Sequence, residues 1–446
     1  MLAHYIVAVF FILSQALASR GEEVAYTWSV SHAEAPHSNR TVINNVLRLP
    51  VVNVTYSDVL VVHITNQLDT SISLRLLGMT NTTTDTLPCL LAPGDSSTYR
   101  FTIEQSGTHY IAVTSVSRQH SSVLMRVPVI ANDADEVFEY QDESVFLFED
   151  THGMFTVNGE QRLPRILMTP FWVYRVRLLN LGHTSVMFSM GQHELSLMEI
   201  DGIEYEPEPA HSVNLLPGQR LSAMVTAKVS NDVNYAYQAT FFDSSASLDL
   251  ADGGQPAKSA DIRATYQGML EYWTGNPTKP VGDWAATGTR LHTAQMTPMA
   301  RFGEWEPTTI VSISECVRVK NSRSISGADT SDTMQISDTT GKWPLCEKSH
   351  SVEVTLKYQE IVQLEVDSVG SMLLWLNTHM FQVITKEKHM GASHAELRSV
   401  DRLVAGNLTV VRFRADVPSV WDLQIPGAPR VVFVEAADRI SDTDFC

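Results

Sequence analysis

Residues 91–103 read LAPGDSSTYRFTI, a Pro-Gly turn followed by a segment in which polar and apolar side chains alternate. Proline presets its own φ and glycine accepts a positive φ, so Pro93-Gly94 predicts a tight turn. The alternation from Ser97 to Ile103 has the period of two that is typical of a half-buried β-strand. Residues 174–178 and 410–414 alternate in the same way. Long helical periodicity is nearly absent, and we therefore predict an all-β chain.

A similar turn before a strand-like segment recurs twice more along the chain. LLPGQR at residues 215–220 is likewise followed by a strand-like segment, and LVAGN at residues 403–407 holds the equivalent place before residues 410–413. Three similar punctuations at wide spacing predict three copies of one β-sandwich. We place domain 1 at residues 24–131, domain 2 at residues 132–273, a proline-containing linker at residues 274–308 and domain 3 at residues 309–446.

The charge balance of the chain is acidic. Among 446 residues, 32 Lys and Arg stand against 50 Asp and Glu, which gives a formal net charge of −18. An acidic surface repels nucleic acid and anionic lipid, so no nucleic-acid partner is expected. No segment beyond the N-terminal region has the length and purity of a transmembrane helix, and no membrane span is predicted.

The N-terminal region has the features of a secretory signal peptide, which we place at residues 1–19. Residues 5–13 are nearly all apolar, and Ala16-Leu17-Ala18 supplies a cleavage site of the small-x-small type. A secreted or lumenal location follows as a prediction. In that compartment Asn-x-Ser/Thr triplets become candidate glycosylation sites. These triplets start at Asn39, Asn53, Asn81 and Asn407.

The four cysteines, an even number, fit an oxidising compartment. Cys316 and Cys346 flank a stretch rich in Ser, Thr and Asp and could close it as a loop. Cys89 would then pair with Cys446 across nearly the whole chain. The sequence by itself allows three pairings.

Seven stretches share their pattern with one known family. They are residues 62–72 and 105–108 in domain 1, residues 174–180, 199–202 and 217–220 in domain 2, and residues 417–421 and 431–436 in domain 3. At these stretches the chain resembles the multicopper oxidases, the family of laccases, ascorbate oxidases and ferroxidases. The resemblance implies secretion and three cupredoxin-like domains, each a Greek-key β-sandwich. Many fungal laccases carry, at the place of Cys89, a cysteine that bridges to the C-terminal tail, which supports the Cys89–Cys446 pairing.

The resemblance also indicates where copper ligands would be expected. The family holds its oxygen-reducing copper cluster with His-x-His pairs, and alternate side chains of a strand project from the same face. In this sequence the first pair falls on Ser73 and Arg75, and the second falls on Ala112 and Thr114. A guanidinium is a permanent cation and does not bind a metal ion. The cluster is therefore predicted to be absent from domain 1.

The corresponding stretches of domain 3 differ from the family in the same way. The family's histidine-rich motif falls on Met372 to His379, where only His379 remains, and the family does not use that histidine as a ligand. Its His-Cys-His motif would begin at Gln424, which places Ile425 at the position of the thiolate that blue copper requires. From these positions we predict no catalytic residue, no metal site and no cofactor, although copper is what the family would lead one to expect.

Large apolar residues stand at or beside several of these positions. We predict that Met372, Leu374, Trp375 and Ile425 fill the space that a blue-copper site would occupy, because an empty pocket lowers stability in proportion to its volume. A one-residue shift of the alignment, which would make some of them ordinary core, is the alternative.

Other residues that could carry chemistry have structural interpretations. His193-Glu194 begins like a zinc-protease helix, but Leu197 stands where the second histidine belongs. For both His193 and His109 we expect structural roles. Trp273, Trp284 and Trp305 lie in or beside the linker, and we expect them to pin it to the domains.

These observations favour a secreted, glycosylated relative of the multicopper oxidases that acts as a non-catalytic binding, scaffold or auxiliary protein. Its expected partners are an active oxidase, a cell-surface component or a phenolic small molecule. Two alternatives stay open. One is a laccase-like oxidoreductase that acts on phenolics or metal ions, and the other is an auxiliary protein that steers phenol coupling in a small-molecule pathway.

Overall fold

The structure is a computed structural model. It describes residues 21–35, 40–79, 90–116, 121–133, 136, 138–151, 153–229, 234–243, 262–272, 305–313, 317–321, 351–357, 359–367, 372–374, 376, 379–385, 394–398, 401–403, 408–415, 420–423, 425 and 430–436. Within these ranges every regular element is a β-strand, which confirms the all-β prediction. The same ranges contain no helix with the length and apolarity needed to cross a bilayer.

The first sandwich consists of two four-stranded sheets. One has the order β2-β1-β4-β6, from strands β2 (Thr41–Ile43), β1 (Glu23–His32), β4 (Val59–Asn66) and β6 (Ser96–Thr102). The other has the order β3-β8-β7-β5, from strands β3 (Val52–Thr55), β8 (Ser121–Asn132), β7 (Gly107–Val116) and β5 (Ile72–Leu77).

The second sandwich is larger. Its six-stranded sheet has the order β10-β9-β12-β17-β14-β15, from β10 (Met154–Val157), β9 (Asp142–Thr151), β12 (Val173–Asn180), β17 (Arg220–Thr226), β14 (Leu195–Ile200) and β15 (Ile203–Ala210). Its five-stranded sheet has the order β11-β19-β18-β13-β16, from β11 (Arg165–Met168), β19 (Ile262–Tyr272), β18 (Tyr235–Phe242), β13 (Ser185–Met190) and β16 (Ser212–Leu215).

The third sandwich has the same kind of six-stranded sheet, in the order β21-β20-β23-β28-β25-β26. Its strands are β21 (Val317–Asn321), β20 (Thr309–Ile313), β23 (Glu360–Asp367), β28 (Leu408–Ala415), β25 (Phe381–Thr385) and β26 (His394–Arg398). Facing it are β22 (Ser351–Lys357), β30 (Arg430–Ala436) and β29 (Val420–Leu423), with β24 (Met372–Leu374) paired to β27 (Asp401–Leu403).

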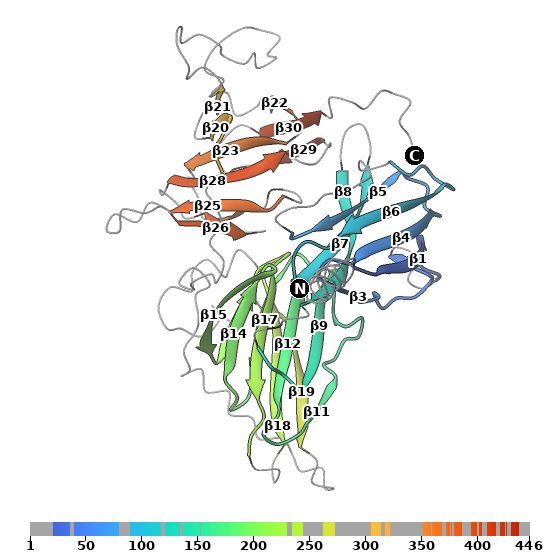
Figure 1. The fold of residues 1–446 in the computed structure, drawn as a ribbon, viewed down its shortest axis with the longest axis vertical. Coiled ribbons are helices and arrows are strands. Elements are labelled where there is room, and N and C mark those ends of the chain that lie inside the picture. Colours follow the sequence, from blue (N-terminus) through green and yellow to red (C-terminus); the bar gives the residue numbers. More distant parts are fainter. Residues whose placement is uncertain are drawn as a thin grey trace, which may run out of the picture.

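One topology is repeated three times. The first strand of each sandwich runs parallel to its neighbour, in the pairs β1–β4, β9–β12 and β20–β23. The opposite sheets repeat a second parallel pair, in β3–β8, β11–β19 and β22–β30. Figure 1 shows the three sandwiches as separate blocks, with the second at the foot of the molecule. The predicted linker lies outside the described residues apart from 305–308, so its boundaries stay a prediction.

The Pro-Gly turns have the same role in the first two sandwiches. In the first, the Asn66 side chain donates to the Thr70 and Leu91 carbonyls, and the Gly94 N–H donates to the Asn66 carbonyl over 2.8 Å. In the second, Asn180 donates in the same way to Thr184 and Leu215, and the Gly218 N–H donates to the Asn180 carbonyl over 2.9 Å. Gly94 and Gly218 have φ of 86° and 79°, values that glycine adopts without steric cost. The predicted repeat is confirmed here, and residues 404–407 of the third lie outside the described ranges.

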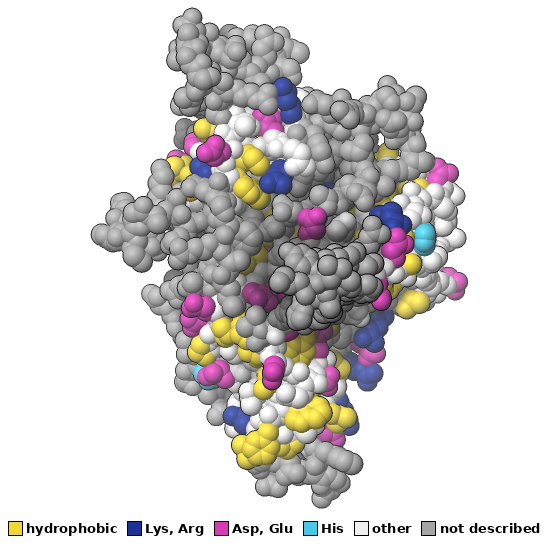
Figure 2. Space-filling model, viewed as in Figure 1, with side chains coloured by type: hydrophobic (Ala, Val, Ile, Leu, Met, Phe, Trp, Pro, Cys, Tyr) yellow, Lys and Arg dark blue, Asp and Glu magenta, His cyan; other side chains and the backbone are white. Residues whose placement is uncertain are grey.

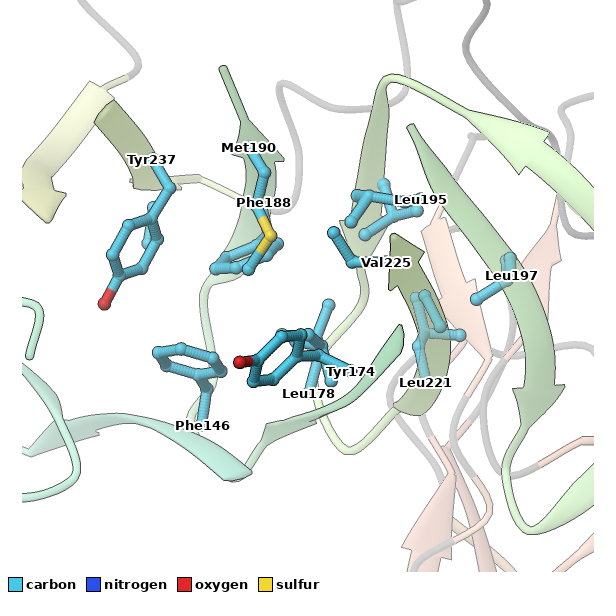
Figure 3. Close-up of a cluster of buried hydrophobic side chains, with 14 of the residues drawn as sticks. Phe146, Tyr174, Leu178, Phe188, Met190, Leu195, Leu197, Leu221, Val225 and Tyr237 are labelled. Carbon is cyan, nitrogen blue, oxygen red and sulfur yellow. The ribbon is translucent and has the colours of Figure 1, made fainter. Parts of the chain in front are cut away.

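Each sandwich encloses its own apolar core. In the second, aromatic rings fill much of the space between the sheets, with the ring centroids of Phe146 and Phe188 5.3 Å apart and those of Phe146 and Tyr237 5.8 Å apart. Figure 3 shows these three rings in one group, with Leu197 and Leu221 at the other end of the cluster. The first and third sandwiches have clusters of their own, and the cluster of the first also includes Leu147, Leu179 and Leu181 of the second, so these two sandwiches share buried apolar surface.

Trp305 joins the second and third sandwiches, as predicted for the linker tryptophans. Its ring packs against the second core, and its backbone N–H donates to the Gln382 side chain over 2.9 Å. The Arg412 guanidinium donates to the Trp305 carbonyl over 2.7 Å. The predictions for Trp273 and Trp284 fall outside the described residues.

Candidate functional site

The structure brings the four predicted copper positions of domain 1 together. In the antiparallel pair β5–β7, Ser73 lies directly opposite Thr114 and Arg75 lies opposite Ala112. Ser73, Ala112 and Thr114 are buried, and the Ser73 and Thr114 hydroxyls have no hydrogen-bond partner in the described residues. The pair Ser73 and Arg75 and the pair Ala112 and Thr114 therefore lie side by side on neighbouring strands, as the alternation of side chains along a strand predicted.

The chemistry of these four side chains does not fit a copper ion. Copper in proteins is held by imidazole and thiolate, whereas two hydroxyls, a methyl group and a guanidinium stand here. Across the described residues no group of three or more His, Cys, Asp or Glu is placed to hold a metal ion. We derive no redox step from this position.

In domain 3, two of the four residues predicted to fill the blue-copper pocket have described side chains. Leu374 and Ile425 are both buried in the third core, with Trp421 and Phe433. His379 is buried beside them, its ring centroid 5.3 Å from that of Trp421 and its Nδ1 3.0 Å from the Leu376 carbonyl. Trp375, Gln424 and the side chain of Met372 lie outside the description.

Several other predicted sites lie where the structure describes nothing. They are residues 1–19, the cysteines Cys89, Cys316, Cys346 and Cys446, and the sequons at Asn39, Asn81 and Asn407. Asn53 is described and its side chain is exposed on β3, a position open to a glycan. Glycosylation, the disulfides and the signal peptide stay predictions.

The described residues also contain a buried network of ion pairs and hydrogen bonds that the sequence analysis did not predict. It lies between β7 of the first sandwich and β12, β14 and β17 of the second, and Glu199 is its centre. The Thr108 N–H donates to Glu199 Oε1 over 2.6 Å, and Arg175 Nη2 donates to Glu199 Oε2 over 2.8 Å. Arg177 Nη1 donates to the same Oε2 over 3.2 Å. The Glu199 side chain is completely buried.

These contacts decide the charge state of Glu199. Burial by itself would raise the pKa of this carboxyl group. The two guanidiniums of Arg177 and Arg175 and the hydrogen bonds from Thr108 outweigh burial and lower the pKa to about 2. Glu199 is therefore an anion at neutral pH, and it compensates buried cations.

The flanking arginines extend this network on both sides. Arg177 Nε donates to Glu143 over 2.6 Å and its Nη1 donates to the Thr108 hydroxyl over 2.8 Å. Arg220 Nε donates to the Thr108 carbonyl over 2.9 Å, and its Nη2 donates to the Asp201 carbonyl over 2.8 Å. The Arg220 guanidinium also lies 4.9 Å from the centre of the Tyr110 ring, within cation–π range.

His109 fills the space beside Arg220. Its Nδ1 lies 3.0 Å from the Gly78 carbonyl and its Nε2 lies 3.1 Å from the Ser106 carbonyl. Burial, and after it the nearby Arg220 cation, lowers the pKa of His109 to about 4. The imidazole is therefore neutral at pH 7 and packs between backbone segments, which agrees with the structural role expected for it.

His193 also has a structural setting, as predicted. Its Nε2 lies 2.6 Å from the Tyr272 hydroxyl, and its Nδ1 lies 2.8 Å from the Gly191 carbonyl. The Tyr272 hydroxyl in turn accepts from the Lys228 N–H over 2.6 Å. Burial lowers the pKa of His193 to about 4.

The half-buried interpretation of residues 174–178 was wrong. The strand β12 is buried along nearly its whole length, and Arg175 and Arg177 are 2% and 0% exposed. The reason is that the first sandwich covers part of β12, where Thr108 bonds to Arg177 and Leu179 packs into the first core. Arg175 is enclosed by Glu136, Glu199 and Ser222. The sequence signal for this buried network was a pair of arginines at i and i+2 of one strand. A strand face exposed to solvent has the same pattern, so the signal did not distinguish the two.

The site can hold two sandwiches in one relative orientation. Its charged groups pair with one another, except that Arg177 Nη2 and Arg220 Nη1 have no hydrogen-bond partner among the described residues. Charges that are desolvated and mutually bonded favour a single geometry over alternatives. Within the described part of the network, the hydroxyl of Thr108 already accepts from Arg177, and His109 is enclosed by backbone. The arrangement supports positioning rather than group transfer.

The amino-acid sequence is similar to known proteins. Residues 24–132 and 131–257 match two family models that are both described as multicopper oxidase. The iron transport multicopper oxidase fio1 of Schizosaccharomyces pombe is 23% identical, over 90% of this chain and 74% of the relative. The iron transport multicopper oxidase fetC of Epichloe festucae is 24% identical, over 91% of this chain and 74% of the relative.

Solved structures show the same fold. Fet3p, described as a multicopper oxidase that functions in iron import, aligns with a TM-score of 0.64 at 18% identity, covering 93% of this chain and 90% of that one. The laccase from Botrytis aclada aligns with a TM-score of 0.61 at 19% identity, covering 96% of this chain and 89% of that one. The predicted cupredoxin-like, three-domain fold is confirmed by these alignments.

The matches also correct one prediction. The chain was predicted to take no cofactor, from the residues at Ser73, Arg75, Ala112 and Thr114 and in domain 3. Both matched family models and both relatives are multicopper oxidases, so copper is the cofactor that the matches imply. The prediction of no cofactor is wrong, because residues at a few aligned positions do not decide what a whole chain binds.

Proposed function

The chain belongs to the multicopper oxidase family, and we propose that within this family it serves as a non-catalytic binding or scaffold protein. The observation that carries the proposal is the register of β5 against β7, which sets Ser73 opposite Thr114 and Arg75 opposite Ala112. Copper remains the cofactor that the family implies. What we propose this chain lacks is the turnover of dioxygen at β5 and β7.

The physical reason lies in the donor groups at that register. Reduction of dioxygen by a copper cluster needs imidazoles that converge from neighbouring strands, and the register would allow such convergence. Neutral hydroxyls bind copper weakly, and the Arg75 guanidinium carries a permanent positive charge that opposes a cation beside it. A substrate could still bind to the protein, but electrons would not reach oxygen by this route.

A scaffold role is also supported by the rigidity of the interface between the first two sandwiches. Glu199, Arg175 and Arg177 are desolvated and bonded to one another, and Thr108 links them to the other sandwich. A binding surface that spans both sandwiches would therefore be preorganised and would lose little entropy on binding.

The proposed setting is the secretory pathway or the space outside the cell. The signal-peptide pattern of residues 1–19 and the exposed sequon at Asn53 support this location. Partners that fit the setting are an active oxidase, a cell-surface component or a phenolic small molecule, and each is a proposal.

A second candidate function is oxidation of ferrous iron or of phenols. It is favoured by the length of the match, since relatives named iron transport multicopper oxidase align with about nine-tenths of this chain. The oxidase would consume dioxygen and the scaffold protein would not, so a measurement of oxygen uptake distinguishes the two candidates.

The experiment uses the full chain, secreted from cells supplied with excess copper. Copper is quantified by mass spectrometry, and oxygen uptake is followed with ferrous iron and with a phenol, beside an active laccase and a heat-inactivated sample. The scaffold proposal expects uptake equal to that of the inactivated sample, whatever the copper content. Sustained uptake that a copper chelator abolishes would overturn it in favour of the oxidase.

A further inference from the structure

A pocket of about 680 Å³ lies between the first and second sandwiches, away from β5 and β7. Its walls come from the loop after β2, the segment from β10 to β11, and strands β18 and β19. Arg48 is the one lining residue from the first sandwich among those described, and the others belong to the second. This volume is in the range of pockets that hold small organic ligands.

The pocket is positively charged on a chain that is strongly acidic. Three guanidiniums, from Arg48, Arg162 and Arg165, line it beside a single carboxylate, that of Glu160. The net charge of the whole chain is −18. Figure 2 shows Lys and Arg side chains in dark blue along the edge of the molecule where these two sandwiches adjoin. A local excess of cations on an anionic protein favours an anionic ligand at that place.

The three arginines differ in whether they already have an ion-pair partner. Arg162 Nε lies 2.5 Å from the Glu160 carboxylate, and Arg165 Nη1 lies 3.8 Å from the Glu271 carboxylate. Arg48 forms no ion pair or hydrogen bond with any residue that the structure describes. Its guanidinium is therefore the group in the pocket with the most donors to offer a ligand.

Arg48 lies beside a turn whose positive φ values favour glycine. Asn158 and Gly159 have φ of 52° and 80° in a two-residue turn between β10 and Glu160. A Cβ added at Gly159 would lie 3.6 Å from the Cα of Arg48, which places the turn of the second sandwich next to this arginine of the first.

Part of the pocket lining is apolar. Val157, Leu163 and Ala236 are buried side chains of the wall, and Pro164 and Met269 add further apolar surface. The Tyr237 hydroxyl donates to the Pro164 carbonyl over 2.6 Å, which fixes that part of the wall. Methionine sulfur and apolar walls make favourable contacts with a flat ring.

We propose that this pocket binds an organic carboxylate with a compact apolar body, held by Arg48. A guanidinium recognises a carboxylate with two parallel N–H donors, and the apolar part of the lining would contact the rest of the ligand. This binding activity goes beyond the proposed scaffold function. It needs neither copper nor oxygen, so it can fail or succeed independently of the test for turnover.

The probe is 2-naphthoate, titrated into the full chain by calorimetry, with neutral 2-naphthamide as the matched ligand. The naphthoate is expected to bind at least about tenfold more tightly than the amide. Arg48→Gln should weaken naphthoate binding by about tenfold and leave the amide unchanged. Because Arg48 is exposed, the variant should fold as the parent does, which thermal unfolding would verify.

Two further variants sharpen the test: one should tighten naphthoate binding and the other should leave it unchanged. Glu160→Gln removes the carboxylate that competes for Arg162, so it should tighten naphthoate binding by several-fold. Arg263→Gln, on β19 but outside the lining, removes an arginine paired with Asp243 at 3.0 Å and should change nothing. Equal affinity for naphthoate and naphthamide, or an affinity that Arg48→Gln leaves intact, would overturn the site. Binding at the exposed Phe171 instead would give that second result.

Discussion

The backbone N–H of Thr108 in the first sandwich donates to the Glu199 carboxylate in the second, over 2.6 Å. This bond joins two segments that are far apart in the sequence, and it lies in a region that water does not reach. The same carboxylate compensates Arg175 and Arg177, so one side chain links the charge balance of the second sandwich to its contact with the first.

Replacing Glu199 with Gln should destabilise the protein by about 3–5 kcal/mol, because two buried guanidiniums would lose their shared carboxylate. The measurement is urea unfolding at pH 7, compared with the parent. Glu206→Gln, at an exposed position of β15, is the control and should change stability by less than about 0.5 kcal/mol. Equal effects of the two substitutions would mean that the network adds no stability.

Gly202→Ala should cost more stability than Gly218→Ala, although the two glycines have φ of 82° and 79°. Both changes place a Cβ on a left-handed residue, which costs about 1–2 kcal/mol. At Gly202 the new Cβ would lie 2.6 Å from His109 Cε1, whereas nothing lies within 4 Å of it at Gly218. We expect about 1–3 kcal/mol of additional loss at Gly202 by thermal unfolding. A difference near zero would show that His109 moves aside freely.

Stability should fall as the pH is lowered from about 6.5 to 4. Burial lowers the pKa of both His109 and His193 to about 4 in the folded protein, from an ordinary value of 6.5. Between these values the unfolded chain binds more protons than the folded one, so each histidine's contribution of roughly 3 kcal/mol is lost as pH falls through this window. Below about pH 4 these two contributions level off. Glu199, with its pKa lowered to about 2, then adds a further loss as pH falls from about 4.5 towards 2.

His193→Gln isolates one of these contributions. The variant should reduce the slope of unfolding free energy against pH, between pH 4.5 and 6, by about 1.4 kcal/mol per pH unit. His211→Gln, at an exposed site next to β16, should leave the slope as it is. If both variants follow the slope of the parent, His193 is protonated in the folded state and its burial does not control its charge.

Trp305→Ala should loosen the third sandwich from the second. The ring packs on the second core and the backbone around it is held by Gln382 and Arg412 of the third sandwich. Calorimetry should then resolve two unfolding transitions where the parent has more closely coupled ones, and limited proteolysis should cut near residue 305 sooner. Phe171→Ala, at an exposed ring of the second sandwich, is the control. Unchanged calorimetric coupling would place the main contact between these sandwiches elsewhere.

Much of the fold follows from local sequence. Pro93-Gly94 and Asp201-Gly202 are turns because their φ values suit the residue types found there, and the alternation around Tyr99 matches the half-buried burial pattern of β6. Such features depend on neighbours along the chain. They can be predicted without knowing what the other sandwiches do.

The polar site could not be predicted in the same way. Arg177 resembles a solvated strand residue until Thr108, about 70 positions earlier, covers it. Arg48 gives no signal of a pocket in the sequence, because the rest of the pocket lining comes from another sandwich. In both cases the deciding contact is between domains, and no local pattern specifies how domains meet.

The paired corners at Asn66 and Asn180 separate architecture from chemistry. Each corner is closed by one amide side chain bonded to the main chain, independent of the side chains on β5, β7 or β13. Mutation can therefore rewrite those strand faces residue by residue while the frame around them persists. A lineage built on such a frame can abandon one chemistry and acquire another without passing through an unfolded ancestor.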